Sequence, residues 1–279
     1  MRLNYWIVVA LIGSVPLVFG TQEGLTLSTP AQIEEEFASV PCQNKVRLEG
    51  VRSLFLKMGA SPEEMSVEKF GEHQNLVVTR NGKEPGRVVI GAHYDFIDKG
   101  CGAIDNWSGI VAIAHTYRTI RHLVPHKTVS FVAFGNEEKG LLGSAAMVRA
   151  IPKADLPQYC AMINIDSFGM GKPFALKNAS SPKLSALVED NAKALQISYY
   201  QVSLNGDSDS HSFLDRNIPA VTLSGLSDGW ENILHSKKDQ AAAVNAVSVY
   251  LGYRLTLSTW AAVDTTPCDA YQEPAAKKP

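Results

Sequence analysis

Residues 87–95 read Arg-Val-Val-Ile-Gly-Ala-His-Tyr-Asp, in which five apolar or small residues after Arg87 lead into three polar ones. A short continuous apolar run of this kind is typical of a strand that is covered on both faces. The pattern recurs at residues 128–138, where Thr-Val-Ser-Phe-Val-Ala-Phe leads into Gly-Asn-Glu-Glu, and at residues 161–166, where Ala-Met-Ile-Asn-Ile leads into Asp. The chain therefore places polar side chains at the ends of three buried strands.

Helical segments alternate with these strands. Apolar periodicity predicts helices over about 30–58, 107–122, 141–149, 182–195 and 239–260, with Thr29 and Ser181 as N-caps ahead of prolines. Further strands are expected at 74–80, 196–202 and 219–223, and Asn81-Gly82 is a hairpin turn signal between strands 74–80 and 87–92. This alternation predicts a single α/β domain over residues 21–266, with a mixed, largely parallel central sheet and helices on both faces.

The two ends of the chain differ from its middle. Arg2 precedes an uncharged apolar stretch, and Val18 and Gly20 occupy the −3 and −1 positions of a cleavage site. This pattern predicts a signal peptide over residues 1–20 and hence a secreted or periplasmic protein. The stretch is also long enough for an uncleaved membrane anchor, but Pro16 favours cleavage. The tail over 267–279 is expected to be loosely ordered.

Charge and cysteine content exclude several classes of function. A formal net charge of −2 gives no electrostatic reason to expect nucleic acid as a partner. The four cysteines have no CxxC spacing, which argues against a thiolate zinc site and leaves one or two disulfides in an exported chain. Cys160 starts a strand and Cys101 lies close to Asp105, so these two are not expected to pair. We expect Cys42–Cys268, because chain ends often lie close together.

Five side chains at the predicted strand ends and neighbouring loops suit a metal site. In open α/β sheets, ligands bind beyond the carboxyl ends of the strands. Two imidazoles and three carboxylates are ligands that zinc takes, and two Zn²⁺ ions with one hydroxide would leave the cluster close to neutral. A lone Asp here is more often an N-cap and a lone His a packed residue, yet these alternatives do not explain five groups at one edge. The five are His93, Asp105, Glu138, Asp166 and His235.

Three further carboxylates lie beside these ligands. Glu137 is adjacent in sequence to Glu138, and a free carboxylate near a metal is what a hydrolase needs as general base. Asp95 and Asp239 each lie within four residues of a histidine of the set. We expect them to orient those imidazoles through hydrogen bonds.

The same segments resemble a known family, the M28 zinc peptidases, from about Asn75 to the last helix. The segments occur in the family's order and are together highly specific. They are Gly91-Ala92-His93-Tyr94-Asp95, Asp105-Asn106-Trp107-Ser108-Gly109, Glu137-Glu138-Lys139-Gly140-Leu141-Leu142-Gly143-Ser144, Asn164-Ile165-Asp166 and His235-Ser236-Lys237-Lys238-Asp239.

The resemblance implies a role for each position. His93 and Asp166 would bind one zinc ion, Glu138 and His235 a second, and Asp105 would bridge the two. Glu137 would be the general base that activates a zinc-bridging water, with Asp95 as a second residue on which catalysis depends. The bond between Asp105 and Asn106 is expected to be cis.

The sequence departs from the family's pattern at the substrate pocket. Many members carry Ser-Asp-His or Ser-Asp-Tyr ahead of a pocket-lining Phe, whereas residues 208–213 read Ser-Asp-Ser-His-Ser-Phe. His211 could face the substrate or cap the following helix. The expected pocket and supporting residues are Asn106, Asp209, His211, Phe213 and Asp239.

The resemblance favours a secreted di-zinc aminopeptidase acting on peptides with a free N-terminus, with apolar or basic N-terminal residues preferred. A monomer without stable membrane association is expected. A glutaminyl cyclase with one zinc is the first alternative, although the continuation Lys139-Gly140-Leu141-Leu142-Gly143-Ser144 is more similar to the peptidases. The second alternative is a binding protein that has lost its metal, against which the complete ligand set argues.

Overall fold

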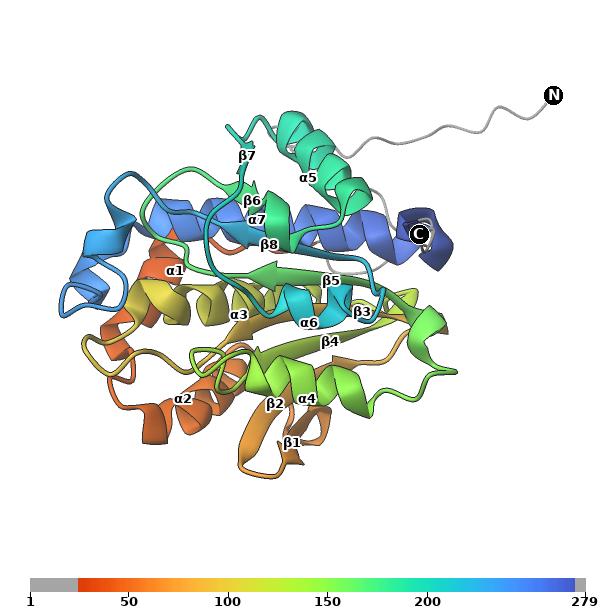
Figure 1. The fold of residues 1–279 in the computed structure, drawn as a ribbon, viewed down its shortest axis with the longest axis horizontal. Coiled ribbons are helices and arrows are strands. Elements are labelled where there is room, and N and C mark those ends of the chain that lie inside the picture. The colour runs from red at the N-terminus through yellow and green to blue at the C-terminus, as the bar shows by residue number, and fades with distance from the viewer. Residues whose placement is uncertain (1–24, 274–279) are drawn as a thin grey trace.

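A computed structural model describes residues 25–273 and shows a central sheet between layers of helices (Figure 1). The predicted signal peptide lies outside the described residues. Among residues 25–273, no helix combines the length and the apolar character needed to cross a membrane.

The sheet has eight strands in the spatial order β1-β2-β4-β3-β5-β8-β6-β7. The inner pairs β4–β3, β3–β5 and β5–β8 are parallel, as is β6–β7, and the other pairs are antiparallel. The predicted mixed, largely parallel sheet is confirmed. The strands are β1 (Met65–Phe70), β2 (His73–Arg80), β3 (Glu84–His93), β4 (Lys127–Phe134), β5 (Tyr159–Ile165), β6 (Phe174–Leu176), β7 (Tyr200–Val202) and β8 (Ala220–Ser224).

Helices cover both faces of the sheet because successive strand residues point to opposite sides. In β4, Phe131 contributes to the larger apolar core, whereas its neighbour Val132 contributes to the smaller one. Helices α3 and α7 pack on the larger core, with α1, α2 and α5 around them, and α4 and α6 cover the other face (Figure 1). The helices are α1 (Pro30–Glu35), α2 (Asn44–Lys57), α3 (Ser108–Ile120), α4 (Leu142–Ala150), α5 (Pro182–Ala194), α6 (Ser210–Leu214) and α7 (Ala246–Thr265).

The predicted hairpin between β2 and β3 is wrong. The two strands are not neighbours, because β4 lies between them and pairs with both. Gly82 crosses over the start of β4, where its N–H donates to the Thr128 hydroxyl at 3.1 Å. A side chain at Gly82 would collide there, since a Cβ would lie 2.3 Å from the carbonyl carbon of Lys127. The Asn-Gly pair therefore serves a close backbone crossing rather than a hairpin turn.

The long first helix predicted over 30–58 is also interrupted. Thr29 caps α1 as expected, with its hydroxyl accepting from the Gln32 N–H at 3.3 Å. The chain leaves helical geometry at Val40, ahead of Pro41, and α2 begins only at Asn44. A residue before proline disfavours the helical region, which explains the break.

At the other end of the chain, α7 begins at Ala246 rather than at Asp239, with Asn245 as its N-cap. The tail is ordered further than expected, since Cys268–Tyr271 forms a helical turn. The tail also packs against α5, where the Lys183 N–H donates to the Glu273 carboxylate at 3.1 Å.

Two disulfides replace the predicted Cys42–Cys268 pair. Cys42 bonds to Cys101, and Cys160 bonds to Cys268. Cys42 lies just before α2, whereas α7 carries the chain to the opposite end of the sheet, where β5 starts. The two terminal cysteines therefore lie apart, and the argument from neighbouring chain ends fails. The expectation that Cys101 and Cys160 do not pair is confirmed.

The Cys160–Cys268 bond closes a loop with a sequence separation of 108 residues, so its loss should cost considerable stability. We expect the double variant Cys160→Ala/Cys268→Ala to lose about 2–5 kcal/mol of unfolding free energy. Chemical denaturation under non-reducing conditions measures this loss. Wild-type protein denatured with reductant is the reference and should lose at least as much, because both bonds then open. An unchanged midpoint in the double variant would contradict the prediction.

Candidate metal centre

Three adjacent parallel strands deliver the first candidate ligands to one edge of the sheet. β3 ends at His93, β5 is followed directly by Asp166, and β4 is followed by the turn that carries Glu137 and Glu138. Because β4, β3 and β5 are neighbours in the sheet, their carboxyl ends meet. The strand-end placement expected from the sequence is therefore what the structure shows.

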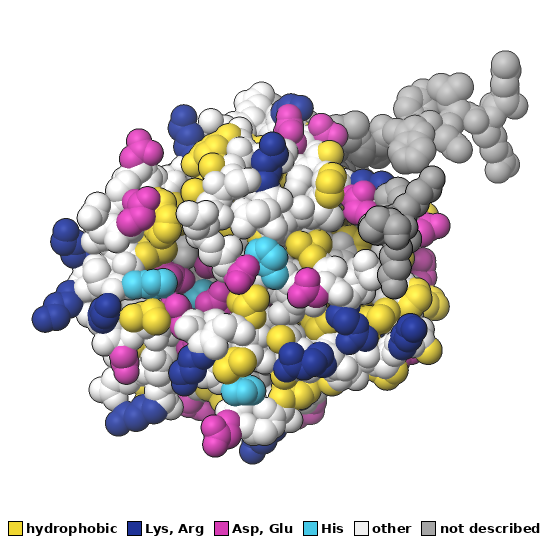
Figure 2. Space-filling view, viewed as in Figure 1, with side chains coloured by type: hydrophobic (Ala, Val, Ile, Leu, Met, Phe, Trp, Pro, Cys, Tyr) yellow, Lys and Arg dark blue, Asp and Glu magenta, His cyan; other side chains and the backbone are white. Residues whose placement is uncertain are grey.

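Asp105 lies at the centre of this group and faces both histidines. One carboxylate oxygen is 3.2 Å from His93 Nε2, and the other is 3.0 Å from His235 Nε2. His93 Nε2 also lies 3.5 Å from Asp166, and His235 Nε2 lies 3.2 Å from Glu138. Two half-sites thus share one carboxylate. Histidine and acidic side chains gather on the face shown in Figure 2.

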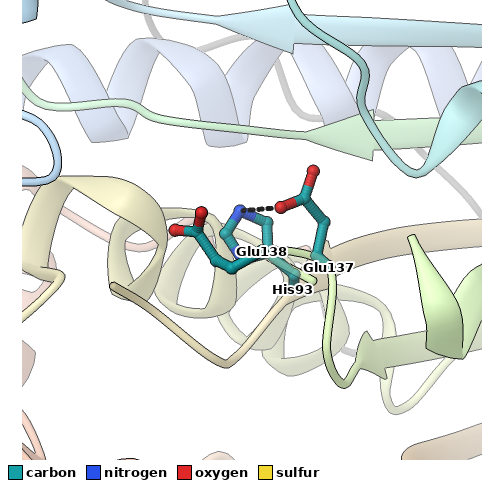
Figure 3. A group of neighbouring side chains, drawn as sticks. All are labelled: His93, Glu137 and Glu138. Atoms are coloured by element: carbon teal, nitrogen blue, oxygen red, sulfur yellow. Dashed lines mark ion pairs between the residues drawn. The ribbon is translucent and has the colours of Figure 1, made fainter. Parts of the chain in front are cut away.

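Glu137 and Glu138 diverge although they are adjacent in sequence. Their carboxylates lie on opposite sides of the His93 ring (Figure 3). Glu138 turns toward His235, whereas Glu137 Oε2 lies 4.0 Å from His93 Nε2. Glu137 therefore stands beside His93, and a ligand atom of Glu138 also lies within 4.8 Å of the Glu137 carboxylate.

Asp95 supports the Glu137–Glu138 turn through its carboxylate. Its two oxygens accept from the N–H groups of Glu137 at 3.0 Å and Glu138 at 3.3 Å. The carboxylate lies 4.0 Å from His93 Nδ1, and it is the Asp95 backbone carbonyl that His93 Nδ1 contacts at 3.0 Å. Asp95 thus orients His93 as expected, but through its main chain. Buried Asn75 holds the same turn, accepting from the Gly135 N–H at 3.1 Å.

Asp239 supports Asp105 rather than His235. Its carboxylate accepts from the N–H of Ile104 at 2.7 Å and of Asp105 at 3.2 Å. In place of the expected contact with the His235 imidazole, Asp239 contacts the backbone of Asp105. The Asp105–Asn106 bond is cis, as expected.

Asn106 is fully buried and does not line a pocket. Its amide donates to the Ile165 carbonyl at 2.8 Å, and its side-chain oxygen accepts from the N–H groups of Gly109 and Ser167. These bonds fasten the Asp105 loop to the end of β5. Asn106 thus supports the site from below the surface.

Two serines that the sequence did not single out hold Asp166. The Ser208 hydroxyl donates to one carboxylate oxygen at 2.7 Å, and the Ser167 hydroxyl contacts the other at 3.1 Å. Asn164 in turn donates to the Ser208 hydroxyl at 2.6 Å. Ser208 starts the Ser-Asp segment over residues 208–213, and the resemblance of that segment to the family's pattern was the available signal.

The segment predicted to line the pocket is mostly buried. Phe213 is fully buried and packs edge-on against Phe134 in the smaller core, so the expected pocket role is wrong for it. His211 caps the start of α6, accepting from the Ser208 N–H at 3.1 Å, with its other nitrogen 3.0 Å from the Asn178 carbonyl. Of the two alternatives for His211, the structure favours the cap. Asp209 is completely buried at the same helix start.

The pKa values of both histidines of the site, His93 and His235, are raised above the ordinary value for histidine. Burial alone would lower the pKa of His93, but Glu137, Asp105 and Asp166 raise it well above its ordinary value. Hydrogen bonds to Asp105 and Glu138 raise the pKa of His235 to about 10. The arrangement therefore favours positive charge at both half-sites.

The buried carboxyl groups of the site also have shifted pKa values. Burial among other acids raises the pKa of Glu137 to about 10 and that of Asp209 to about 7. Burial also raises the pKa of Asp105, but hydrogen bonds from both histidines hold it well below its usual range. This cluster of carboxylates would be stabilised by cations.

The donor set fits a metal ion of the zinc type. Three groups of side chains present ligand atoms that lie within 4.8 Å of one another. They are His93, Asp105 and Asp166, then Asp105, Glu138 and His235, and finally His93, Glu137 and Glu138. One Glu138 oxygen is buried and has no hydrogen-bond partner within the described residues, which leaves it free to bind an ion. Imidazole nitrogen and carboxylate oxygen are the ligands that zinc takes in such sites.

A comparison with known protein families identifies the chain. Its residues 75–251 match Peptidase family M28, and this stretch contains all five candidate ligands. The protein belongs to the M28 family. Among curated relatives, a probable leucine aminopeptidase 2 of Arthroderma benhamiae is 26% identical over 208 residues, covering 64% of this chain and 42% of the relative. Aminopeptidase Y of Saccharomyces cerevisiae is 28% identical over 177 residues, covering 60% and 32%.

These coverages mean that the chain spans less than half the length of these curated M28 relatives. Solved structures share its fold. A zinc aminopeptidase of Bacillus subtilis has a TM-score of 0.63 at 22% identity, covering 71% of this chain and 52% of the neighbour. A glutaminyl cyclase of an Acidobacteriales bacterium has a TM-score of 0.72 at 15% identity, covering 89% and 99%.

Proposed function

We propose that this M28 protein is a secreted di-zinc aminopeptidase that hydrolyses the N-terminal residue from peptides. The observation that carries the proposal is the placement of Asp105, whose two oxygens face the histidines of two separate half-sites. A single-metal centre would need only one of these half-sites. The aminopeptidase names of the curated relatives support the choice of reaction.

Two zinc ions, when bound by the five residues, would supply Lewis acidity for the scissile carbonyl and electrostatic attraction for the attacking water. His93 and Asp166 would hold one ion, Glu138 and His235 the other, and Asp105 both. The exposed position of His235, whose side chain is 53% accessible, places the second half-site toward solvent. A substrate would therefore enter from the His235 side, with the buried half-site behind it.

Glu137 is the proposed general base. Its carboxylate lies beside the His93 half-site, and no described residue donates a hydrogen bond to it. The carboxylate would take a proton from the attacking water and return it to the leaving amine nitrogen as the C–N bond breaks. Burial raises the pKa of Glu137, so positive charge at the neighbouring ligands is needed to keep it ionised at neutral pH.

The test of this function is a panel of aminoacyl amides assayed together with metal analysis of the same sample. We expect hydrolysis that depends on a free amino group, prefers apolar or basic residues, requires two zinc ions per chain and disappears with a chelator. Hydrolysis that persists in metal-free protein would contradict the proposal.

A glutaminyl cyclase is the second candidate, because this chain covers 99% of the Acidobacteriales enzyme but only about half of the Bacillus aminopeptidase. The same panel separates the two when it includes peptides with N-terminal Gln. One zinc per chain, ammonia release from N-terminal Gln and intact aminoacyl amides would establish the cyclase instead.

Asp95 should matter for turnover although it holds only backbone groups of the turn. In Asp95→Ala, the N–H groups of Glu137 and Glu138 lose their acceptors, and we expect an about 10–100-fold loss of kcat/KM or of zinc affinity. Asp98→Ala is the matched control, because Asp98 is an exposed residue of the same loop. Equal activity in the two variants would show that the turn needs no support from Asp95.

A further inference from the structure

Arg47 of α2 is an unusual residue, because its large cationic side chain is fully buried. The guanidinium lies between two aromatic rings, with Cζ 4.4 Å from the centroid of Phe96 and 5.2 Å from that of Trp107. Its Nε and Nη1 atoms are buried and have no hydrogen-bond partner among the described residues. Within residues 25–273, its acceptors are the carbonyls of Cys101 and Gly102, both reached from Nη2.

Burial of a charge with unsatisfied donors is costly, and an apolar side chain of similar size would commonly serve the core as well. Stacking on two rings compensates part of that cost, because an aromatic face attracts a cation. The charge also has distant partners, since Asp239, Asp105 and Asp95 raise the pKa of Arg47 against the effect of burial. The residue therefore makes a poor core residue but is well placed to support the metal centre.

The two carbonyls that Arg47 holds belong to the loop of the bridging ligand. Cys101 and Gly102 directly precede Ala103–Trp107, the segment that carries Asp105. At Gly102 the backbone has φ +51°, and a Cβ would lie 2.4 Å from Phe96. The loop therefore packs closely against Phe96, whose ring covers the guanidinium of Arg47. A shift of Phe96 would displace the loop.

Other residues in or just before α2 also contact the segments that carry or support the candidate ligands. Asn44, one turn before Arg47, donates to the Phe96 carbonyl at 2.8 Å and accepts from the Phe96 N–H at 3.1 Å. Phe96 follows Asp95, which supports the Glu137–Glu138 turn. Cys42 ties Cys101 covalently to the chain just before α2. Arg47 adds the only charged group among these contacts of α2.

We propose that Arg47 is a positioning residue for the metal centre, fixing the Cys101–Gly102 backbone so that Asp105 is held between the two half-sites. This inference rests on the proposed metal site. It assigns a functional role to α2, although Arg47 lies 55 residues before Gly102, whose carbonyl it holds. The planar stacking of the guanidinium between two rings and the two bonds from its Nη2, rather than its charge alone, perform this role.

The test is the variant Arg47→Lys, which keeps the positive charge and loses the planar fork. Metal-free protein is titrated with zinc against a chromogenic chelator, and kcat and KM are measured for leucine amide. We expect zinc affinity to fall about 10–100-fold, as for loss of other groups that orient metal ligands. We also expect kcat to fall at saturating zinc with KM unchanged, because the bridging carboxylate is misplaced while the rest of the site remains.

Arg80→Lys is the matched control. Arg80 also donates to a carbonyl, that of Leu123 at 3.0 Å, has a buried Nε without a partner, and lies at the opposite end of the sheet, where β4 begins. Both variants should lower the thermal midpoint of the metal-free protein, but only Arg47→Lys should weaken zinc binding. Equal zinc affinities in Arg47→Lys and wild type, or an equal fall in Arg80→Lys, would overturn the proposal.

A second variant covers the case in which Arg47→Lys does not fold. Phe96→Leu removes one of the stacking rings and keeps an apolar side chain, and we expect a smaller fall in zinc affinity in the same direction. Unchanged zinc affinity in Phe96→Leu would count against the positioning role. If the wild-type protein binds no zinc, the proposed function and this inference both fail. If the wild type and Arg47→Lys bind zinc equally well, only the inference fails.

Discussion

Glu137→Gln should retain both zinc ions and lose about 10²–10⁴-fold in kcat, because the amide keeps the shape of the side chain but cannot accept a proton. Glu137 makes neither of the contacts to His235, which come from Glu138 and Asp105, so its replacement should leave those contacts intact. Metal analysis and steady-state kinetics on the same preparation measure both quantities. The result would distinguish a chemical role from a role in binding the ions.

The neighbouring residue provides the control for this experiment. Glu138→Gln removes a carboxylate that faces His235, and we expect it to reduce zinc content rather than turnover per bound zinc pair. Glu189→Gln, on α5, where the side chain is partly exposed and pairs with Lys193, should change neither. A fully active Glu137→Gln would exclude Glu137 as the general base.

Asp105→Ala should have the second large effect, because a single carboxylate faces both histidines. We expect zinc content to fall from two ions to one or fewer, and activity to fall by more than the about 10–100-fold that loss of a ligand-orienting group costs. Equilibrium dialysis with zinc, followed by activity at saturating metal, measures the two changes.

A graded series makes this prediction sharper. Asp239→Ala removes only the acceptor for the Ile104 and Asp105 N–H groups, so its effect should be intermediate. Asp228→Ala, in an exposed loop, should leave both quantities unchanged. An Asp105→Ala protein that still binds two zinc ions would show that the bridge is not needed.

Much of the site could be predicted from local sequence, because strand ends and ligand positions coincide. An apolar run followed by His93, or by Asp166, is readable without knowing which strands are neighbours. The rule that parallel strands share a functional edge then brings the residues together. The cis bond after Asp105, implied by the family resemblance, was also confirmed.

The parts that were missed depend on contacts between distant segments. The insertion of β4 between β2 and β3 is a choice of neighbours that the Asn-Gly pair does not reveal. The disulfide partners depend on where α7 brings Cys268, and the burial of Phe213 depends on its packing against Phe134 at the end of β4. Arg47 lies in an ordinary helical pattern, and its burial arises only when the loop of Asp105 folds over it.

Formation of the Cys42–Cys101 disulfide depends on the redox conditions of the compartment in which the protein resides. Disulfides form in oxidising compartments and are rarely kept in a reducing cytosol. A newly made chain in the cytosol would carry two thiols here, and the loop before Asp105 would lose its covalent tie while keeping its hydrogen bonds to Arg47 and Asp239. Full peptidase competence would then be reached only after oxidation, which would protect proteins at the place of synthesis. Recombinant production should accordingly use an export route or an oxidising host.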